Sequence, residues 1–128
     1  MGEYVFGFEN LEVYKRAREF RKKIYRLAAK LPSDERFNLA QQMRRAAVSL
    51  TNNIAEGHGR LHFQESIQFF RQSRGSLQEL LDDVNTCIDE HYDNESDLNA
   101  LKTEGAELLR FLNGYIAFLR RSKSAISQ

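Results

Sequence analysis

The sequence is poor in the residues that build disulfide frameworks, turn-rich sheets and membrane spans. Its 128 residues contain one cysteine, one proline, seven glycines and no tryptophan. A single cysteine, Cys87, excludes an intramolecular disulfide framework and a cysteine-rich zinc site, and it fits a reducing cytoplasm. Scarce proline and glycine favour helices over a β-sandwich. We therefore expect an all-α protein, and its length predicts a single domain over residues 1–128.

Long apolar runs are also missing. No stretch approaches the roughly 20 apolar residues of a membrane span, so we expect no membrane contact. The first ten residues, MGEYVFGFEN, include acidic side chains and do not read as a secretory signal, so a cytoplasmic location is expected. Their apolar side chains argue against a free tail. Two alternatives stay open for this arm: packing on the end of the fold, or exchange with a neighbouring copy.

Charge is unevenly distributed although the net charge is only +1. Residues 15–30 carry eight basic side chains against one acid, Glu19, whereas residues 79–107 carry ten acids against one base, Lys102. The near-neutral total therefore hides a basic region and an acidic region.

The spacing of apolar residues predicts four helices, at about residues 11–30, 34–57, 63–91 and 95–121. The first shows the seam of a helix bundle, with apolar residues three and four apart: Val13, Ala17, Phe20, Ile24, Leu27 and Leu31. Short connections between helices of this length predict an antiparallel, up-down-up-down four-helix bundle. Gly75 and Gly105 fall inside the last two helices, and each is expected to mark the close approach of another helix.

The stretch from residue 37 to residue 60 is unusually poor in charge. Between Phe37 and Gly57 its charged residues are Arg44, Arg45 and Glu56. One side forms an apolar stripe of Leu39, Met43, Ala46, Leu50 and Ile54. The opposite side is mostly small or apolar, so the helix has little surface suited to water. We infer that a second copy of the chain covers part of it.

A polar strip runs along the same helix through Arg45, Ser49, Asn53 and Glu56. A partly buried arginine and glutamate must be paired, because an uncompensated buried charge is very costly. The strip is expected to form a network that fixes helix register or a subunit contact, and a ligand site is the alternative. Gly57 and Gly59 are expected to end the helix in the left-handed conformation.

Several residues of this stretch match a known motif: Gln42, Arg45-Ala46-Ala47-Val48-Ser49, Asn53-Ile54-Ala55-Glu56-Gly57 and Arg60. Further matches are Phe8, Leu11, Val13, Ala17, Pro32, Glu35, Gly75-Ser76 and Glu79, with Ser73 as a departure from the usual alanine. With these residues the chain resembles the bacterial four-helix-bundle proteins encoded by intervening sequences in 23S ribosomal RNA genes. The resemblance implies a bundle that assembles into a ring, with a pentamer as the expected size. It brings no settled biochemical activity.

No catalytic, metal or cofactor site is expected. The polar strip has no nucleophile beside a base and no second carboxylate at helical spacing, so we do not expect an enzyme. His58 and His62 flank Gly59-Arg60, but no clear cysteine or carboxylate completes a metal site with them.

Basic side chains are the candidate nucleic-acid contacts. They are Lys15, Arg18, Lys22 and Arg26 on one side of the first helix, Arg60 in the loop after the second helix, and Arg71 and Arg74 on the third helix. A ring would repeat them, so weak phosphate contacts would gain by avidity. The alternatives are a solvated face, or a first helix that complements the acidic region across a subunit interface.

These observations favour a non-enzymatic, homo-oligomeric assembly or adaptor module that binds RNA or a nucleic-acid-handling partner. The resemblance supports this expectation, because related genes lie in ribosomal RNA genes and similar ring-forming bundles accompany reverse transcriptases. The alternative function is a structural or protein-binding oligomer without nucleic-acid contact.

Overall fold

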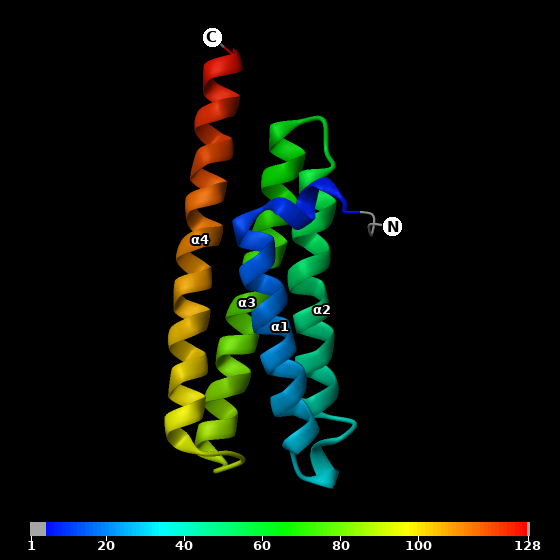
Figure 1. The fold of residues 1–128 in the computed structure, drawn as a ribbon, viewed down its shortest axis with the longest axis vertical. Coiled ribbons are helices and arrows are strands. Elements are labelled where there is room, and N and C mark those ends of the chain that lie inside the picture. Colours follow the sequence, from blue (N-terminus) through cyan, green and yellow to red (C-terminus); the bar gives the residue numbers. More distant parts are fainter. Residues whose placement is uncertain (1–4, 128) are drawn as a thin grey trace.

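In the computed structural model, residues 5–127 are described, with side chains through residue 123. This part of the chain contains four α-helices: α1 (Glu12–Lys30), α2 (Leu39–His58), α3 (Phe63–Asp89) and α4 (Glu95–Ser127). Two short 3-10 helices, η1 (Gly7–Asn10) and η2 (Ser33–Glu35), precede α1 and α2. No strand occurs between residues 5 and 127, and consecutive α-helices run in opposite directions (Figure 1). The predicted all-α four-helix bundle is confirmed.

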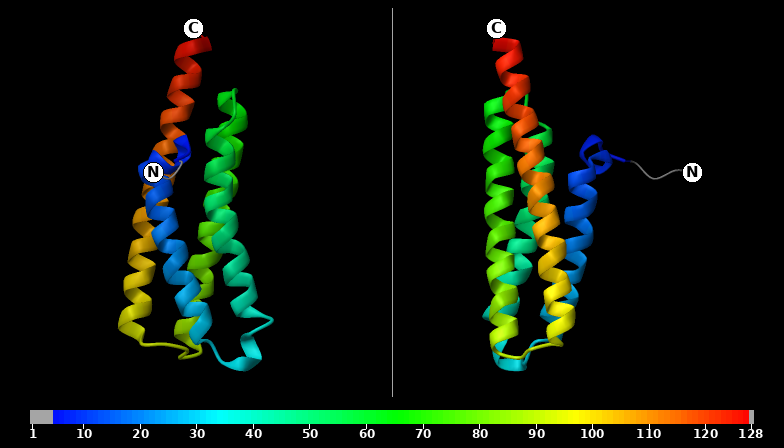
Figure 2. Two further views of the ribbon diagram at one scale, coloured as in Figure 1. Left: turned by 45° about the vertical axis from the view of Figure 1, so that its right-hand side comes forward. Right: turned by 90° about the vertical axis from the view of Figure 1, so that its left-hand side faces the viewer.

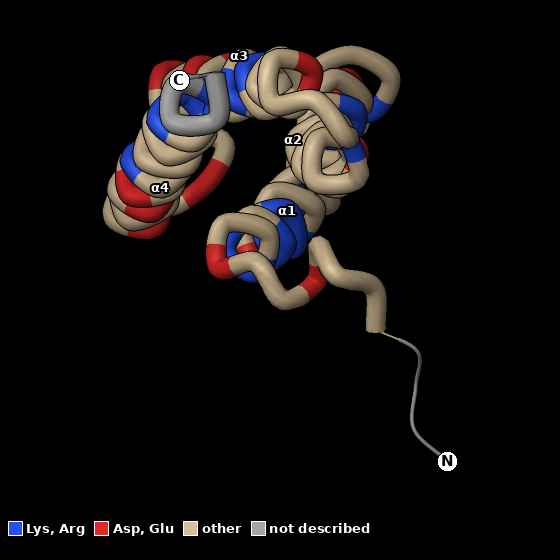
Figure 3. Tube along the Cα trace, turned by 90° about the horizontal axis from the view of Figure 1, so that it is seen from above, with Lys and Arg blue, Asp and Glu red and all other residues tan. Residues whose placement is uncertain are grey.

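The four helices form an arc in chain order when the bundle is viewed along its axis (Figure 3). Helix α2 packs against α1 and α3, and α3 packs against α4. Helices α1 and α4 are at the two ends of the arc and meet less closely, while α1 and α3 are not neighbours. The C-terminal end of α4 extends beyond the other helices (Figure 2). None of the helices described is long and apolar enough to cross a membrane.

The core consists largely of the predicted apolar stripes. Five of the six predicted seam residues of the first helix are buried, and the sixth, Leu31, follows the end of α1 and is half-buried. All five stripe residues of α2 are buried. Phe20 of α1 and Phe70 of α3 are among the largest fully buried side chains. Burying such side chains is the main favourable contribution to folding.

The predicted start of the second helix near residue 34 is wrong. Residues Ser33–Glu35 form η2, and α2 begins at Leu39. The cause is a pair of hydrogen bonds to the Glu35 carboxylate, from the Tyr92 hydroxyl at 2.7 Å and from the Asn38 amide group at 3.0 Å. These bonds hold residues 33–38 outside the α-helix, and the bond from Tyr92 lowers the pKa of Glu35.

The other helix ends differ less from the prediction. Helix α3 ends at Asp89 rather than near residue 91, because His91 takes a positive φ of 57°. Helix α4 continues to Ser127 instead of ending near residue 121.

The predicted left-handed glycines after the second helix are wrong. Gly57 lies inside α2 and Gly59 has a φ of −82°, and none of the glycines described has a positive φ. Gly57 is needed for a different reason. A Cβ atom there would lie 2.9 Å from the Phe70 ring, so only glycine allows α3 to pack this closely.

The two glycines inside the later helices behave differently from each other. A Cβ atom on Gly105 would lie 2.5 Å from Cδ2 of Leu81 and 3.2 Å from Cζ of Phe20, which confirms the predicted close approach. A Cβ atom on Gly75 would meet nothing within 4 Å. Within the chain the close approach predicted at Gly75 is therefore wrong.

The N-terminal segment packs on one end of the bundle. Helix η1 contacts α1 and α2, and the Phe8 ring meets the Tyr14 ring edge-on at a centroid distance of 5.0 Å. Of the two alternatives for the arm, packing therefore holds for Gly7–Asn10. The part of the arm before residue 5, including Tyr4, lies outside the described residues.

Candidate nucleic-acid interface

The structure places four of the predicted basic residues together on the outer face of α1. Lys15, Arg18, Lys22 and Arg26 recur every three or four residues, which places them on one side of a helix. All four are exposed, opposite the buried stripe of the same helix. The stripe spans roughly 16 Å at the rise of an α-helix. We call these four residues the outer stripe.

Carboxylates neutralise only part of the outer stripe. Lys22 Nζ lies 2.7 Å from Glu19 Oε2, and Arg18 Nη1 lies 4.0 Å from Glu9 Oε1. The hydrogen bond and charge of Lys22 lower the pKa of Glu19. Exposed pairs of this kind contribute little free energy, about 0–1 kcal/mol. The side chains of Lys15 and Arg26 form no ion pair or hydrogen bond with the residues that the structure describes.

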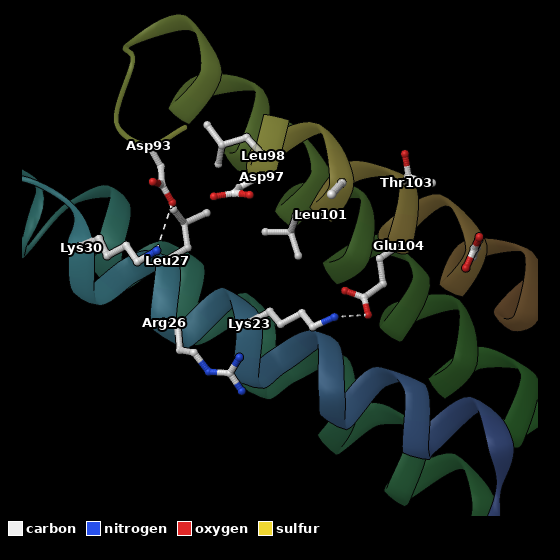
Figure 4. A pocket seen from close by; sticks show the side chains of 12 residues that line it. Lys23, Arg26, Leu27, Lys30, Asp93, Asp97, Leu98, Leu101, Thr103 and Glu104 are labelled. Carbon is white, nitrogen blue, oxygen red and sulfur yellow. Dashed lines mark hydrogen bonds and ion pairs between the residues drawn. The ribbon is translucent and has the colours of Figure 1, made fainter. Parts of the chain in front are cut away.

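A second row of basic residues on α1 faces α4, and its side chains already contact residues on that side. Lys23 Nζ lies 2.7 Å from Glu104 Oε1, and Lys30 Nζ lies 3.3 Å from Asp93 Oδ2 (Figure 4). The Arg16 guanidinium lies 3.9 Å from the centroid of the Phe111 ring. We call Arg16, Lys23 and Lys30 the inner row. The basic and acidic regions, which were expected to meet across a subunit interface, thus already meet within one chain at these two ion pairs.

A charged groove lies beside the inner row, between α1 and α4. Its volume is about 510 Å³, and Figure 4 shows Lys23 and Lys30 on one side and Glu104 and Asp93 on the other. Arg26 extends away from Glu104 in the same view. Two of the cations that line the groove, Lys23 and Lys30, are thus already paired with carboxylates of the same groove.

The remaining basic candidates lie on other surfaces. Arg60 pairs with Glu56 at 2.8 Å and with Glu65 at 3.6 Å, and its guanidinium lies 4.6 Å from the Phe69 ring centroid. Arg74 donates a hydrogen bond of 2.9 Å to Asn113 of α4, and Arg71 is exposed. Since α1 and α3 are not neighbours, Arg71 and Arg74 do not extend the outer stripe within one chain.

The predicted polar network along α2 does not form as one unit. Arg45 and Glu56 are both exposed, and they stand eleven residues apart, or roughly 16 Å along a helix. Glu56 pairs with Arg60 instead. Asn53 donates to the Ser49 carbonyl at 2.8 Å, and the Ser76 hydroxyl donates to Ser49 Oγ at 2.9 Å. Only this middle part of the strip links α2 to α3.

Two further polar contacts fix helix positions and were not predicted. The buried Ser73 hydroxyl donates to the Leu50 carbonyl at 2.7 Å and adds a bond between α3 and α2. Arg21 Nη1 donates to Thr51 Oγ1 at 2.8 Å and links α1 to α2. The sequence offered one signal for the second contact, because Arg21 falls between the core and outer faces of a helical wheel.

Asp83 is the most unusual titratable group. It is 8% exposed, and its Oδ2 atom has no hydrogen-bond partner among the described residues. Burial and the nearby charges of Glu79 and Asp82 raise its pKa to about 6. Burial likewise raises the pKa of Cys87 to about 11, so this thiol is not an activated nucleophile. No group of three or more metal-binding side chains occurs in the described part of the chain.

The fold and the exposed basic face define a small all-α bundle protein. The chain belongs to the family of 23S rRNA-intervening sequence proteins, whose model matches residues 9–114. It is also similar to a crystal structure of a protein of unknown function from the S23 ribosomal protein family of Bacteroides thetaiotaomicron. The TM-score is 0.75 at 19% identity, covering 82% of this chain and 95% of that one. At this identity the likeness shows the fold alone. No curated protein matches the chain.

Proposed function

We propose that this protein is a non-enzymatic, homo-oligomeric assembly or adaptor module that binds RNA, directly or with a nucleic-acid-handling partner. The observation that carries the proposal is the outer stripe of α1, where Lys15 and Arg26 are exposed and have no carboxylate partner among the described residues. Contacts from such cations to phosphates give affinity that falls with salt and carries no base specificity.

Oligomerisation is supported by apolar surface on α4 rather than by α2. Helix α2 is flanked on both sides by α1 and α3, which explains within one chain why it has so few charges. On α4, Phe111 and Phe118 are 38% and 50% exposed. They border a hollow of about 500 Å³ that Leu11 and Val13 also line. Exposed apolar patches of this kind mark protein interaction sites.

A second copy that covers this part of α4 leaves the outer stripe free for RNA. The family suggests a ring, with a pentamer as the expected size, and a ring repeats the stripe on each subunit. Repetition raises the overall affinity when several weak sites engage one RNA molecule. The proposed location is the bacterial cytoplasm, where single thiols such as Cys87 stay reduced.

A second candidate function is a structural or protein-binding oligomer without nucleic-acid contact. It is favoured by the exposed rings of Phe111 and Phe118, which form an apolar surface suited to a protein partner. Under this alternative the outer stripe is a solvated face.

Measurement of mass in solution, with and without RNA, tests both candidates. We expect light scattering at micromolar concentration to give a multiple of the 14.9 kDa chain mass, and a larger mass when RNA is added at low salt. An oligomer that ignores RNA supports the second candidate. A monomer that ignores RNA contradicts both.

A further inference from the structure

One exposed aromatic ring differs from the others in its surroundings. The exposed aromatic residues among those described are Phe6, Tyr25, Phe37, Phe111 and Phe118. The rings of Phe6 and Phe118 contact other rings, and those of Phe37 and Phe111 lie near arginine side chains. Tyr25 is 39% exposed and has neither kind of contact, nor a hydrogen bond, with any residue that the structure describes. Its ring is therefore open to a ligand.

Tyr25 lies on the edge of the outer stripe that faces α2. Arg21, one helical turn earlier, donates a hydrogen bond to Thr51 of α2, and this contact fixes the direction of that edge. Because α1 and α2 are antiparallel, the next turn of α1 places Tyr25 at the level of Ala47 and Val48. The ring thus stands beside the outer stripe and not beside α4.

Helical spacing places basic residues on both helices next to this ring. On α1, Arg18, Lys22 and Arg26 lie within about two turns of Tyr25. On α2, Arg44 lies one turn from Ala47 and Val48, is half-buried, and forms no ion pair within the described chain. The one acid of this part of α1, Glu19, is already bonded to Lys22. The surroundings of the ring therefore favour an anionic ligand.

We propose that Tyr25 is a stacking platform for an unpaired base of single-stranded RNA, whose phosphates lie along Lys22 and Arg26. This inference rests on the proposed function and names its ligand. Basic surfaces that carry an open aromatic ring are typical of proteins that bind single strands, because every base has a face that can stack.

Duplex RNA fits this surface less well. In an A-form duplex the bases are stacked on one another, and the major groove is too narrow and deep for side chains to reach them. A ring on a convex helix face therefore has no base to stack on in a duplex. The outer stripe still contacts duplex phosphates, so the ring and not the charge makes the difference between the two ligands.

The test compares three labelled RNA probes by fluorescence anisotropy at low salt. The probes are a single strand roughly ten nucleotides long, within the usual site sizes of single-strand binders, its blunt duplex, and an abasic strand of equal length. The protein variants are Tyr25→Ala and Tyr25→Phe, in the full chain. Because Tyr25 is exposed, both variants are expected to fold, and thermal unfolding checks this.

We expect the single strand to bind more tightly than the duplex. Tyr25→Ala should weaken single-strand binding roughly five- to tenfold, the lower end of what one stacked base contributes, and Tyr25→Phe should retain it. The same substitution should leave binding of the duplex and of the abasic strand nearly unchanged.

Three results would overturn the inference: equal single-strand binding by Tyr25→Ala and the native protein, an equal loss on the abasic strand, or tighter binding of the duplex. RNA binding that ignores Tyr25 leaves the proposed function standing. Absence of RNA binding by the native protein at low salt removes the proposed function together with the inference.

Discussion

The two rows of basic residues on α1 are offset by about one residue along the helix, but their surroundings differ almost completely. The inner row of Arg16, Lys23 and Lys30 meets Phe111, Glu104 and Asp93 of the α4 side. The outer stripe begins at Lys15, one residue before Arg16, and faces water. The comparison teaches that the density of positive charge along a helix does not predict a binding surface. What counts is which cations the rest of the chain leaves without a partner.

The largest effect is expected from reversing charge on the outer stripe. Lys22→Glu combined with Arg26→Glu should weaken RNA binding by roughly 100-fold or more at low salt, because two phosphate contacts become repulsions. Anisotropy with a single-stranded probe measures the change. The matched control is Lys23→Glu in the inner row, for which a loss of only a few-fold is expected. Equal losses in the two rows would remove the distinction between them.

A larger residue at Gly105 should disrupt the close packing of α4 against Leu81 and Phe20. Gly105→Leu should lower the free energy of unfolding by about 3 kcal/mol, since the added atoms overlap Leu81 and the fully buried Phe20. A Cβ atom on Gly75 meets no neighbouring atom of the described chain, so Gly75→Leu should instead raise the free energy of unfolding by up to about 1 kcal/mol through helix propensity. Urea unfolding compares the two variants, and a similar loss in both would contradict the packing described.

Asp83 extends the comparison from exposed cations to a buried acid without a partner. Its pKa in the folded state, about 6, lies above the ordinary aspartate value. The folded state therefore binds more protons than the unfolded state between roughly pH 4 and 6, and stability falls as the pH rises through this range.

Replacing Asp83 with a neutral residue tests whether stability falls as the pH rises. Asp83→Asn should stabilise the protein by about 1–2 kcal/mol at pH 7.5, since a pKa difference of one unit corresponds to about 1.4 kcal/mol. The gain should shrink as the pH falls from 6 toward 4. Thermal or urea unfolding across this range measures it, and a gain that grows toward low pH would refute the assignment.

The smallest effect is expected from removing the carboxylate partner of one cation in the inner row. Glu104→Gln removes the partner of Lys23, and the pair is exposed enough that stability should change by less than about 1 kcal/mol. RNA affinity should rise slightly, by roughly twofold, because one acid is lost and one cation is released. Unchanged or weaker RNA binding would show that charge freed at the inner row cannot reach the ligand.

Most of the fold could be predicted from the sequence, because burial repeats every three to four residues along each helix. The α1 seam from Val13 to Leu27 and the α2 stripe from Leu39 to Ile54 were placed correctly on this basis. The start of α2 could not be predicted, because it depends on Tyr92 bonding to Glu35 across 57 residues of sequence. Neither Ser33 nor Asp34 gives a local signal of that contact.

The candidate site was predicted only in part, for a similar reason. Helical spacing alone placed Lys15, Arg18, Lys22 and Arg26 on one face. It could not show that Lys23 and Lys30 meet carboxylates far away in the sequence, or that Glu56 pairs with Arg60 and not with Arg45. Tyr25 was missed because its distinguishing feature is an exposed ring on which no other ring or guanidinium of the described residues is packed, and only the structure shows this.

The salt dependence of single-strand RNA binding by the native protein tests the account most directly. If the four cations of the outer stripe each contact one phosphate, a plot of log association constant against log salt concentration should have a slope near −3 per site. The slope should become much shallower in the Lys22→Glu, Arg26→Glu variant. A native slope near zero, or no RNA binding at low salt, would contradict the claim that the cations on the outer face of α1 hold RNA.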